Sequence, residues 1–222
     1  IVSTKKDGFL ESNAVAVTPQ LPIVNIELRV ETAASTLYNQ NLTVAACKES
    51  NGIYSLNGRC ALEQSGLAPQ WTAWDNDLFL DTLGGIANNQ ADNGIYWNWF
   101  KNLDYSQTAL NNHILTEGEK LLLSYGRNPL RIDAATSTPY LNSTTTLTLE
   151  QFAFDASWNP VWQAAASSTL VVNGQEFFSI DGALALFIAS TSPYTISGSK
   201  TGYLDSPILI LTGILPPAAP IT

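Results

Sequence analysis

Residues 94–126 decide how the first half of the chain is interpreted, and they read GIYWNWFKNLDYSQTALNNHILTEGEKLLLSYG. Alternation along the aromatic run places Trp97 and Trp99 on one face of a predicted strand and Phe100 on the other. A turn then introduces a second apolar strand at residues 120–125. This pattern is typical of a β-sheet folding unit, and it carries no acid, base or nucleophile arranged for catalysis.

The residues before this stretch predict a hairpin and a short helix. Residues 23–30 alternate between apolar and polar, and residues 42–47 supply the second strand of the expected hairpin. Residues 60–67 are predicted to form a helix that stops at Gly66. Hairpin, helix, aromatic strand and final strand follow the order of a β-grasp, an α+β arrangement, which we expect over residues 23–127.

Several of these motifs resemble the transcobalamin-like C-terminal domain of secreted bacterial and archaeal proteins. Residues 61–67, ALEQSGL, are similar to that family's helix motif Ala-Leu-x-x-Ala-Gly-Leu, with Ser65 in place of alanine. The aromatic run after Gly94 and the acidic-Gly-acidic turn at residues 117–119 are similar to its closing strands. The resemblance implies a β-grasp, and a corrinoid as the natural small ligand. The cobalamin carriers in that family also have a large helical domain, which residues 1–222 do not contain.

Residues 128–211 predict a second domain of short strands, spaced about ten residues apart and separated by Gly turns. Turns at Asn173-Gly174 and Asp181-Gly182 precede the run YTISGSKTGY, residues 194–203. This order resembles bacterial immunoglobulin-like and carboxypeptidase-regulatory-like surface modules, which implies an immunoglobulin-like β-sandwich. The expected fold class is therefore mainly β, with a β-grasp domain followed by a sandwich.

The two ends of the chain predict extended segments. Residues 1–22 form an arm with one short apolar run before Pro19, and residues 212–222 form an uncharged, proline-rich tail. Strand candidates for pairing between subunits are expected in the arm and just before the tail: Ala14, Val15, Ala16 and Val17, and then Ile208, Leu209, Ile210 and Leu211.

Cys47 and Cys60 are the only cysteines, and the Asn-Gly pairs at 51–52 and 57–58 predict turns between them. One interpretation is a disulfide that closes this loop, and the other is a pair of buried thiols. A metal site is disfavoured because the single histidine, His113, is distant and no further thiols exist. The chain contains no methionine, which favours removal of a signal or leader peptide and an extracellular or cell-surface location.

Composition argues against two classes of partner. The net charge is −9, and the ten Lys and Arg residues are scattered, so nucleic acid is not expected. The longest apolar run, residues 207–215, is too short for a membrane span. Charged residues make up 13% of the chain, against roughly 25% in average soluble domains.

Four tryptophans in the first domain admit two interpretations. They fill the core or an interface, or they form a stacking platform for a planar ligand or a glycan. The residues in question are Trp71, Trp74, Trp97 and Trp99.

Other candidate sites are weaker. Asp75, Asp77 and Asp81 are close enough in sequence to suggest calcium, but a solvated acidic loop is the favoured interpretation, since the glycine and terminal glutamate of a calcium loop are missing. We expect His113 to be a surface or turn residue, and we expect no catalytic residues, resident metal or cofactor. Asn41 and Asn142 begin sequons for N-glycosylation.

These observations favour a non-enzymatic secreted structural protein. The expected assembly is an extracellular filament, a pilus-like fibre or a surface layer, in which copies of the chain join head to tail by β-strand addition. The alternative is a ligand-binding module at the cell surface that displays a corrinoid or glycan site. Other cell-surface proteins or glycans are further expected partners.

Overall fold

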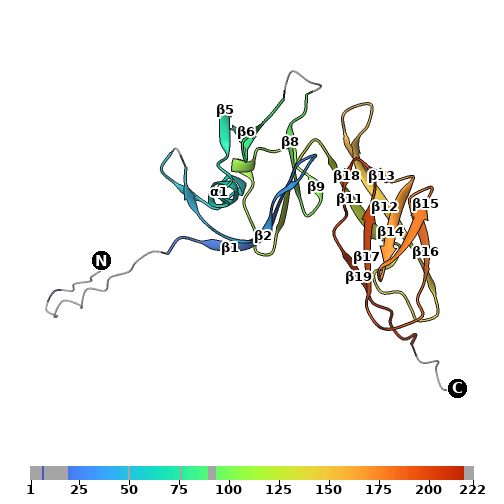
Figure 1. Ribbon diagram of the computed structural model, residues 1–222. Coiled ribbons are helices and arrows are strands. Elements are labelled where there is room, and N and C mark those ends of the chain that lie inside the picture. Colours follow the sequence, from blue (N-terminus) through green and yellow to red (C-terminus); the bar gives the residue numbers. More distant parts are fainter. Residues whose placement is uncertain (1–6, 8–19, 50, 76, 90–93, 218–222) are drawn as a thin grey trace.

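The computed structural model describes residues 7, 20–49, 51–75, 77–89 and 94–217. They form two β domains, and the fold class is mainly β, as expected (Figure 1). The first domain contains β1 (Ile23–Glu31), β2 (Thr36–Ala45), β3 (Cys47–Lys48), β4 (Tyr54–Ser55), α1 (Gly58–Gln64), β5 (Gln70–Trp74), β6 (Asp77–Leu83), β7 (Ile86–Ala87), β8 (Trp97–Lys101), β9 (Asp104–Tyr105), the short 3₁₀ helix η1 (Leu110–Asn112) and β10 (Lys120–Tyr125). The second contains β11 (Asn128–Ala134), β12 (Thr144–Phe154), β13 (Pro160–Ala164), β14 (Ser168–Val172), β15 (Gln175–Ser179), β16 (Ala183–Phe187), β17 (Tyr194–Ser199), β18 (Tyr203–Leu204) and β19 (Leu209–Leu211).

The main sheet of the first domain has the strand order β2-β1-β10-β8-β9. The hairpin β1–β2 is antiparallel, while β1 and β10 lie parallel at the centre, with Leu28 opposite Leu121. A parallel pair needs a long connection, and here that connection carries α1, the hairpin β5–β6 and β8. The predicted order of hairpin, helix, aromatic strand and last strand is therefore present.

The helix begins two residues earlier than the sequence predicts and ends at Gln64. The Asn57 side chain accepts a hydrogen bond from the Cys60 amide at 3.2 Å, so Asn57 caps the helix N-terminus. The turn predicted at Asn57-Gly58 is thus a helix start. Gly58 is required there for space, because a Cβ would lie 2.6 Å from Cδ2 of Leu110.

The predicted alternation of the aromatic strand is confirmed. Trp97 and Trp99 are 9% and 8% exposed, and they pack with α1 and β1 in the core of the first domain. Their indole nitrogens donate to backbone carbonyls, at 3.0 Å to Ile86 and 2.9 Å to Thr108, so burial leaves neither nitrogen unsatisfied. Phe100, on the opposite face, is fully buried in a different cluster.

The second domain is a two-layered sandwich. One sheet has the order β13-β12-β11-β18, with β16 also paired to β12, and the other has the order β15-β14-β17-β19. The predicted Asn-Gly turn joins β14 to β15: Asn173 and Gly174 both have positive φ values, 50° and 83°, as a two-residue hairpin of the favoured hand requires. Buried Leu and Ile side chains from both sheets form its core.

The sandwich packs against part of the face of the first sheet that the helix leaves open. Phe100 and Leu122 from the first domain meet Phe152 and Leu204 from the second, and all four are buried. The Phe152 ring lies edge-on to Phe100, with centroids 5.0 Å apart. Phe152 also stacks on Tyr105 at 5.2 Å, and burial raises the pKa of that tyrosine. This interface joins the two domains.

The end of the sandwich lies beyond the predicted boundary at residue 211. The Ile214 amide donates to Pro139, and its carbonyl accepts from Leu141, at 2.9 and 2.7 Å. Gly213 passes so close to the sandwich that a Cβ would lie 2.5 Å from Ile188. The first residues of the predicted tail therefore belong to the sandwich, while residues 218–222 lie outside the described part.

A carboxylate in the turn before β10 links that turn to the neighbouring central strand, β1, through hydrogen bonds. The Glu117 carboxylate, in the turn before β10, accepts from the backbone and side-chain amides of Asn25 in β1, at 2.8 and 3.0 Å. The backbone bond, followed by the side-chain bond, lowers the pKa of Glu117. Because the folded pKa is lower than the unfolded one, the contribution of Glu117 to stability is present above the unfolded value and is lost as pH falls through the folded value.

We predict that Glu117→Gln flattens the acid end of the stability profile. The native chain should lose stability as pH falls below about 4.3, the ordinary pKa of glutamate, and the variant should lose less. Urea midpoints measured from pH 7 to pH 3 check this, with Glu176→Gln on the exposed side of β15 as the control. Parallel profiles for Glu117→Gln and the native chain would contradict it.

We predict that Phe152→Ala destabilises the chain by about 3–5 kcal/mol, because it opens a cavity between the domains. Phe178→Ala, on a side chain that is 69% exposed, should change the free energy of unfolding by less than about 0.5 kcal/mol. Equilibrium denaturation measures both. Equal effects of the two substitutions would mean that the aromatic interface does not hold the domains together.

Candidate assembly surfaces

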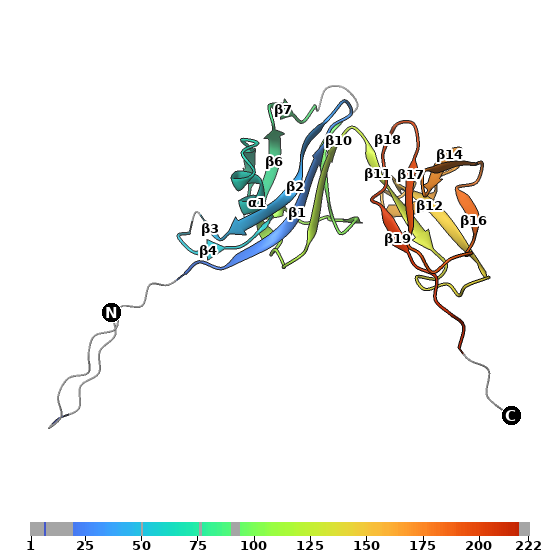
Figure 2. The same cartoon turned by 60° about the horizontal axis from the view of Figure 1, so that its bottom comes forward.

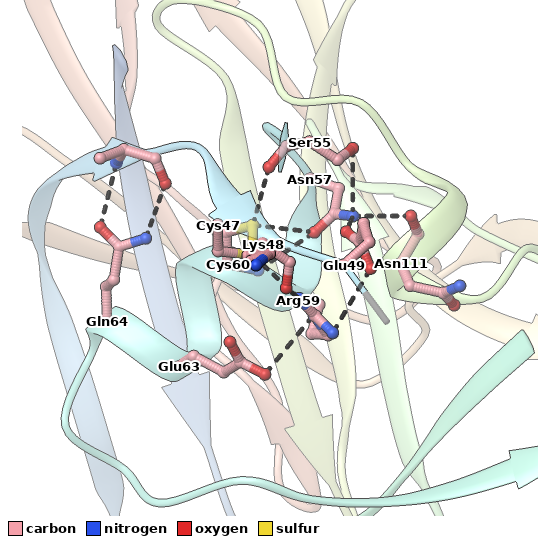
Figure 3. The surroundings of a disulfide bond; sticks show 11 residues. Cys47, Lys48, Glu49, Ser55, Asn57, Arg59, Cys60, Glu63, Gln64 and Asn111 are labelled. Atoms are coloured by element: carbon pink, nitrogen blue, oxygen red, sulfur yellow. Dashed lines mark hydrogen bonds and ion pairs between the residues drawn. A yellow bond between two sulfur atoms is a disulfide. The ribbon is translucent and has the colours of Figure 1, made fainter. Parts of the chain in front are cut away.

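The two cysteines form a disulfide, so the bridged interpretation of the pair is the one observed. Cys47 in β3 and Cys60 in α1 have Cα atoms 5.6 Å apart (Figure 3). Arg59 lies against the bridge and donates to Sγ of Cys47 at 3.2 Å and to the Lys48 carbonyl at 2.9 Å. The disulfide thus ties the small hairpin β3–β4 to the start of the helix, beside the first residues of β1.

The carboxylates do not assemble a metal site among the residues that the structure describes. There, one group of three possible ligands lies close together, formed by Cys47, Glu49 and Cys60, and both of its sulfurs are joined in the disulfide. Asp77 accepts a hydrogen bond from the Asn112 side chain at 2.5 Å, and it does not cluster with Asp75 and Asp81. The acidic hairpin therefore lacks the converging oxygens that calcium needs.

The four tryptophans do not form a common platform. Trp97 and Trp99 are buried in the core, and Trp71 packs against that core from β5. Trp74 is different, because it is 76% exposed at the tip of the hairpin β5–β6. The ligand-platform interpretation is therefore wrong for Trp97 and Trp99, which the alternation of β8 turns inward.

His113 lies in the loop that follows η1, as its sequence context suggests, but it is mostly buried and is not a surface residue. Its side chain is 13% exposed, and its Nε2 lies 2.5 Å from Oε1 of Glu119, whose side chain is completely buried. The other oxygen of Glu119 accepts from the amide and hydroxyl of Thr116 and lies 3.6 Å from the Lys101 ammonium. The sequence offered one signal for this buried pair, the acidic-Gly-acidic turn at residues 117–119. Its second acid, Glu119, is the one that points inward.

Strand β19 overlaps the predicted segment 208–211, but it is not an unpaired strand. Leu209–Leu211 pairs with β17 of the same sandwich, with Ile196 opposite Leu209 and Tyr194 opposite Leu211. Leu211 is buried in the sandwich core, so this segment cannot leave to join another subunit without opening that core. The prediction of a donor strand here is wrong. The strand instead forms one edge of its sheet.

The described chain begins and ends at opposite poles of the molecule (Figure 2). At the first pole, where β1 begins, exposed apolar side chains come from Leu21, Ile23, Ile53 and Tyr54. At the second pole, where β19 and the residues after it end the sandwich, they come from Tyr140, Phe187, Ile208, Ile210, Ile214 and Leu215. We call these the β1 pole and the β19 pole. Large apolar patches on a protein surface often mark interaction sites.

The remaining predicted residues are placed as follows. Asn41 is exposed on the edge strand β2, and Asn142 is exposed at a turn with a φ of 61°. Residues 14–17 lie outside the described residues. No helix in the described parts of the chain is long and apolar enough to cross a membrane.

Comparison with known proteins adds little. No family model matches the chain, and no curated protein matches it. Among solved structures, a "putative metal binding protein" from Ruminococcus gnavus ATCC 29149 is similar at 13% identity. The similarity covers 46% of this chain and 95% of that one, with a TM-score of 0.35. Agreement this low supports no transfer of fold or function.

We predict that removing the disulfide with the double substitution Cys47→Ser and Cys60→Ser lowers the free energy of unfolding by about 3 kcal/mol. The estimate reflects the loop entropy that the bridge removes from the unfolded chain. Denaturation with and without a reductant checks it. The reductant should destabilise the native chain by a similar amount and leave the double variant unchanged, and an unaffected native chain would contradict the prediction.

Proposed function

We propose that this chain is a non-enzymatic secreted structural protein, a subunit of an extracellular filament or surface layer. Copies join head to tail, with the β1 pole of one copy against the β19 pole of the next. The single observation that carries the proposal is the outer edge of β19, which no strand among the described residues covers. Ile208, just before β19, and Ile210, in its middle, are 68% and 55% exposed.

Free sheet edges are normally protected, because they invite pairing with other chains. Natural proteins place charges, proline, bulges or covering loops on such edges. Here Pro207 precedes β19, but the sequence from Pro207 to Thr222 contains no Lys, Arg, Asp or Glu. An edge left apolar and uncharged is expected where pairing is the function.

The two poles differ, and this favours an open assembly. The β1 pole carries the disulfide-linked hairpin, and the β19 pole carries the edge of the sandwich. A contact between two unlike surfaces is heterologous, so repetition yields a filament unless the rotation between copies closes a ring. The rigid interface around Phe152 keeps the poles apart, which suits a subunit that transmits load along a fibre.

A further feature is consistent with the proposed location. The disulfide suits an oxidising, extracellular compartment.

We predict that deleting residues 1–19 abolishes filament formation and leaves a folded monomer. The cores of both domains draw on residues after Gln20, so the truncated chain should retain its circular dichroism spectrum and its cooperative unfolding. Electron microscopy and sedimentation velocity of native and truncated chains measure the assembly. Dispersed native chains at high concentration would contradict the proposed function, as would normal filaments from the truncated chain.

A further inference from the structure

We propose that the free edge of β19 is the acceptor site for assembly, and that its occupant is the arm of a second copy, paired through residues 14–17. This inference rests on the proposed function and deepens it, because it names the two surfaces that meet. It also replaces the sequence-based expectation that β19 donates a strand, since β19 receives one.

The backbone of β19 is oriented to receive a strand. The Thr195 carbonyl accepts from the Asn173 amide at 2.9 Å, so the peptide groups of Thr195 point toward β14. Ile210 is opposite Thr195 in the β17–β19 ladder. Antiparallel pairs alternate between bonded and non-bonded, and the amide and carbonyl of Ile210 therefore point away from β17. No other described strand pairs with β19 on that side.

Strand β2 is a longer edge strand than β19, but it is less suitable. The Gln64 side chain closes one end of β2, because it accepts from the Ala45 amide at 3.0 Å and donates to the Ala45 carbonyl at 2.7 Å. The middle of β2 exposes Asn39, Gln40 and Asn41, which solvate well and gain little from pairing. An incoming apolar strand thus buries more apolar surface at β19.

The arm matches this edge in length and pattern. Residues 14–17 read AVAV, four residues without charge, and the acceptor segment 208–211 also has four residues without charge. On the outer face of the sheet, valines from the arm would cover the exposed Ile208 and Ile210. On the inner face, Leu211 is already buried, so the small alanines fit there better. Val15 and Val17 therefore lie beside Ile208 and Ile210.

The occupant comes from a neighbouring copy because of where the arm starts. The arm leads into β1 at the β1 pole, opposite the β19 pole of the same copy (Figure 2). In a head-to-tail arrangement, the β1 pole of the next copy is adjacent to β19. The arm then reaches its acceptor with few intervening residues, which lowers the entropy cost of ordering it.

Cross-linking between two singly substituted chains tests the pairing. Chains carrying Val15→Cys or Val17→Cys are mixed with chains carrying Ile208→Cys or Ile210→Cys, and are then oxidised under assembly conditions. At least one of these four mixtures should give covalent dimers of the two different chains, seen by mass spectrometry and on non-reducing gels. Mixtures with Phe178→Cys, which is equally exposed at the opposite edge of the same sheet, should give none.

A second measurement uses point substitutions in the full chain. Ile210→Lys places a charge at the acceptor edge and should raise the critical concentration for assembly by about tenfold or more, as expected when an apolar side-chain contact with the valines of the arm is lost. Phe178→Lys should leave it unchanged. Both side chains are exposed, so each variant should keep the native urea midpoint.

The outcomes separate this inference from the proposed function. Filaments that form without any cross-link to residues 208 and 210 would overturn the acceptor site and leave the structural role intact. Cross-links through Ala14→Cys and Ala16→Cys in place of the valines would overturn the assignment of faces. Chains that never assemble would overturn both proposals.

Discussion

The contact between Phe152 and the open face of the first sheet determines how the two domains are joined. A β-grasp sheet with a helix on one face still has a second face to cover, and here Phe100 and Leu122 would be exposed on it. The sandwich supplies Phe152 and Leu204 to that face, and the four buried side chains join two domains into one body. This contact sets the separation of the two poles, and the poles carry the proposed function.

Much of the fold could be predicted because it depends on local alternation. The pattern of Trp97, Trp99 and Phe100 assigns each side chain to the face that it occupies, and Lys120–Tyr125 is a strand with the predicted bounds. The Asn173-Gly174 turn was likewise predictable, because two positive φ values select those residue types.

What escaped prediction depends on contacts between residues that are distant in the sequence. The burial of Glu119 beside His113 requires the turn before β10 to fold over Trp99, and the ring of Trp99 lies 5.1 Å from that of His113. The pairing of β19 with β17 depends on the order of the strands in the sandwich. The alternation of apolar and polar residues along one strand does not predict which strands it will pair with. The same limit explains why a strand of the sandwich was mistaken for a free donor strand.

The proposed assembly by strand addition would give a single physical role to the uncharged edge at β19 and to the two unlike apolar poles. A helical reconstruction of the assembled protein tests this most directly. We predict an additional strand beside β19 in every subunit, continuous with the chain that enters β1 of the neighbouring copy. A reconstruction in which the edge of β19 is bare, or is covered by the arm of its own copy, would contradict the account.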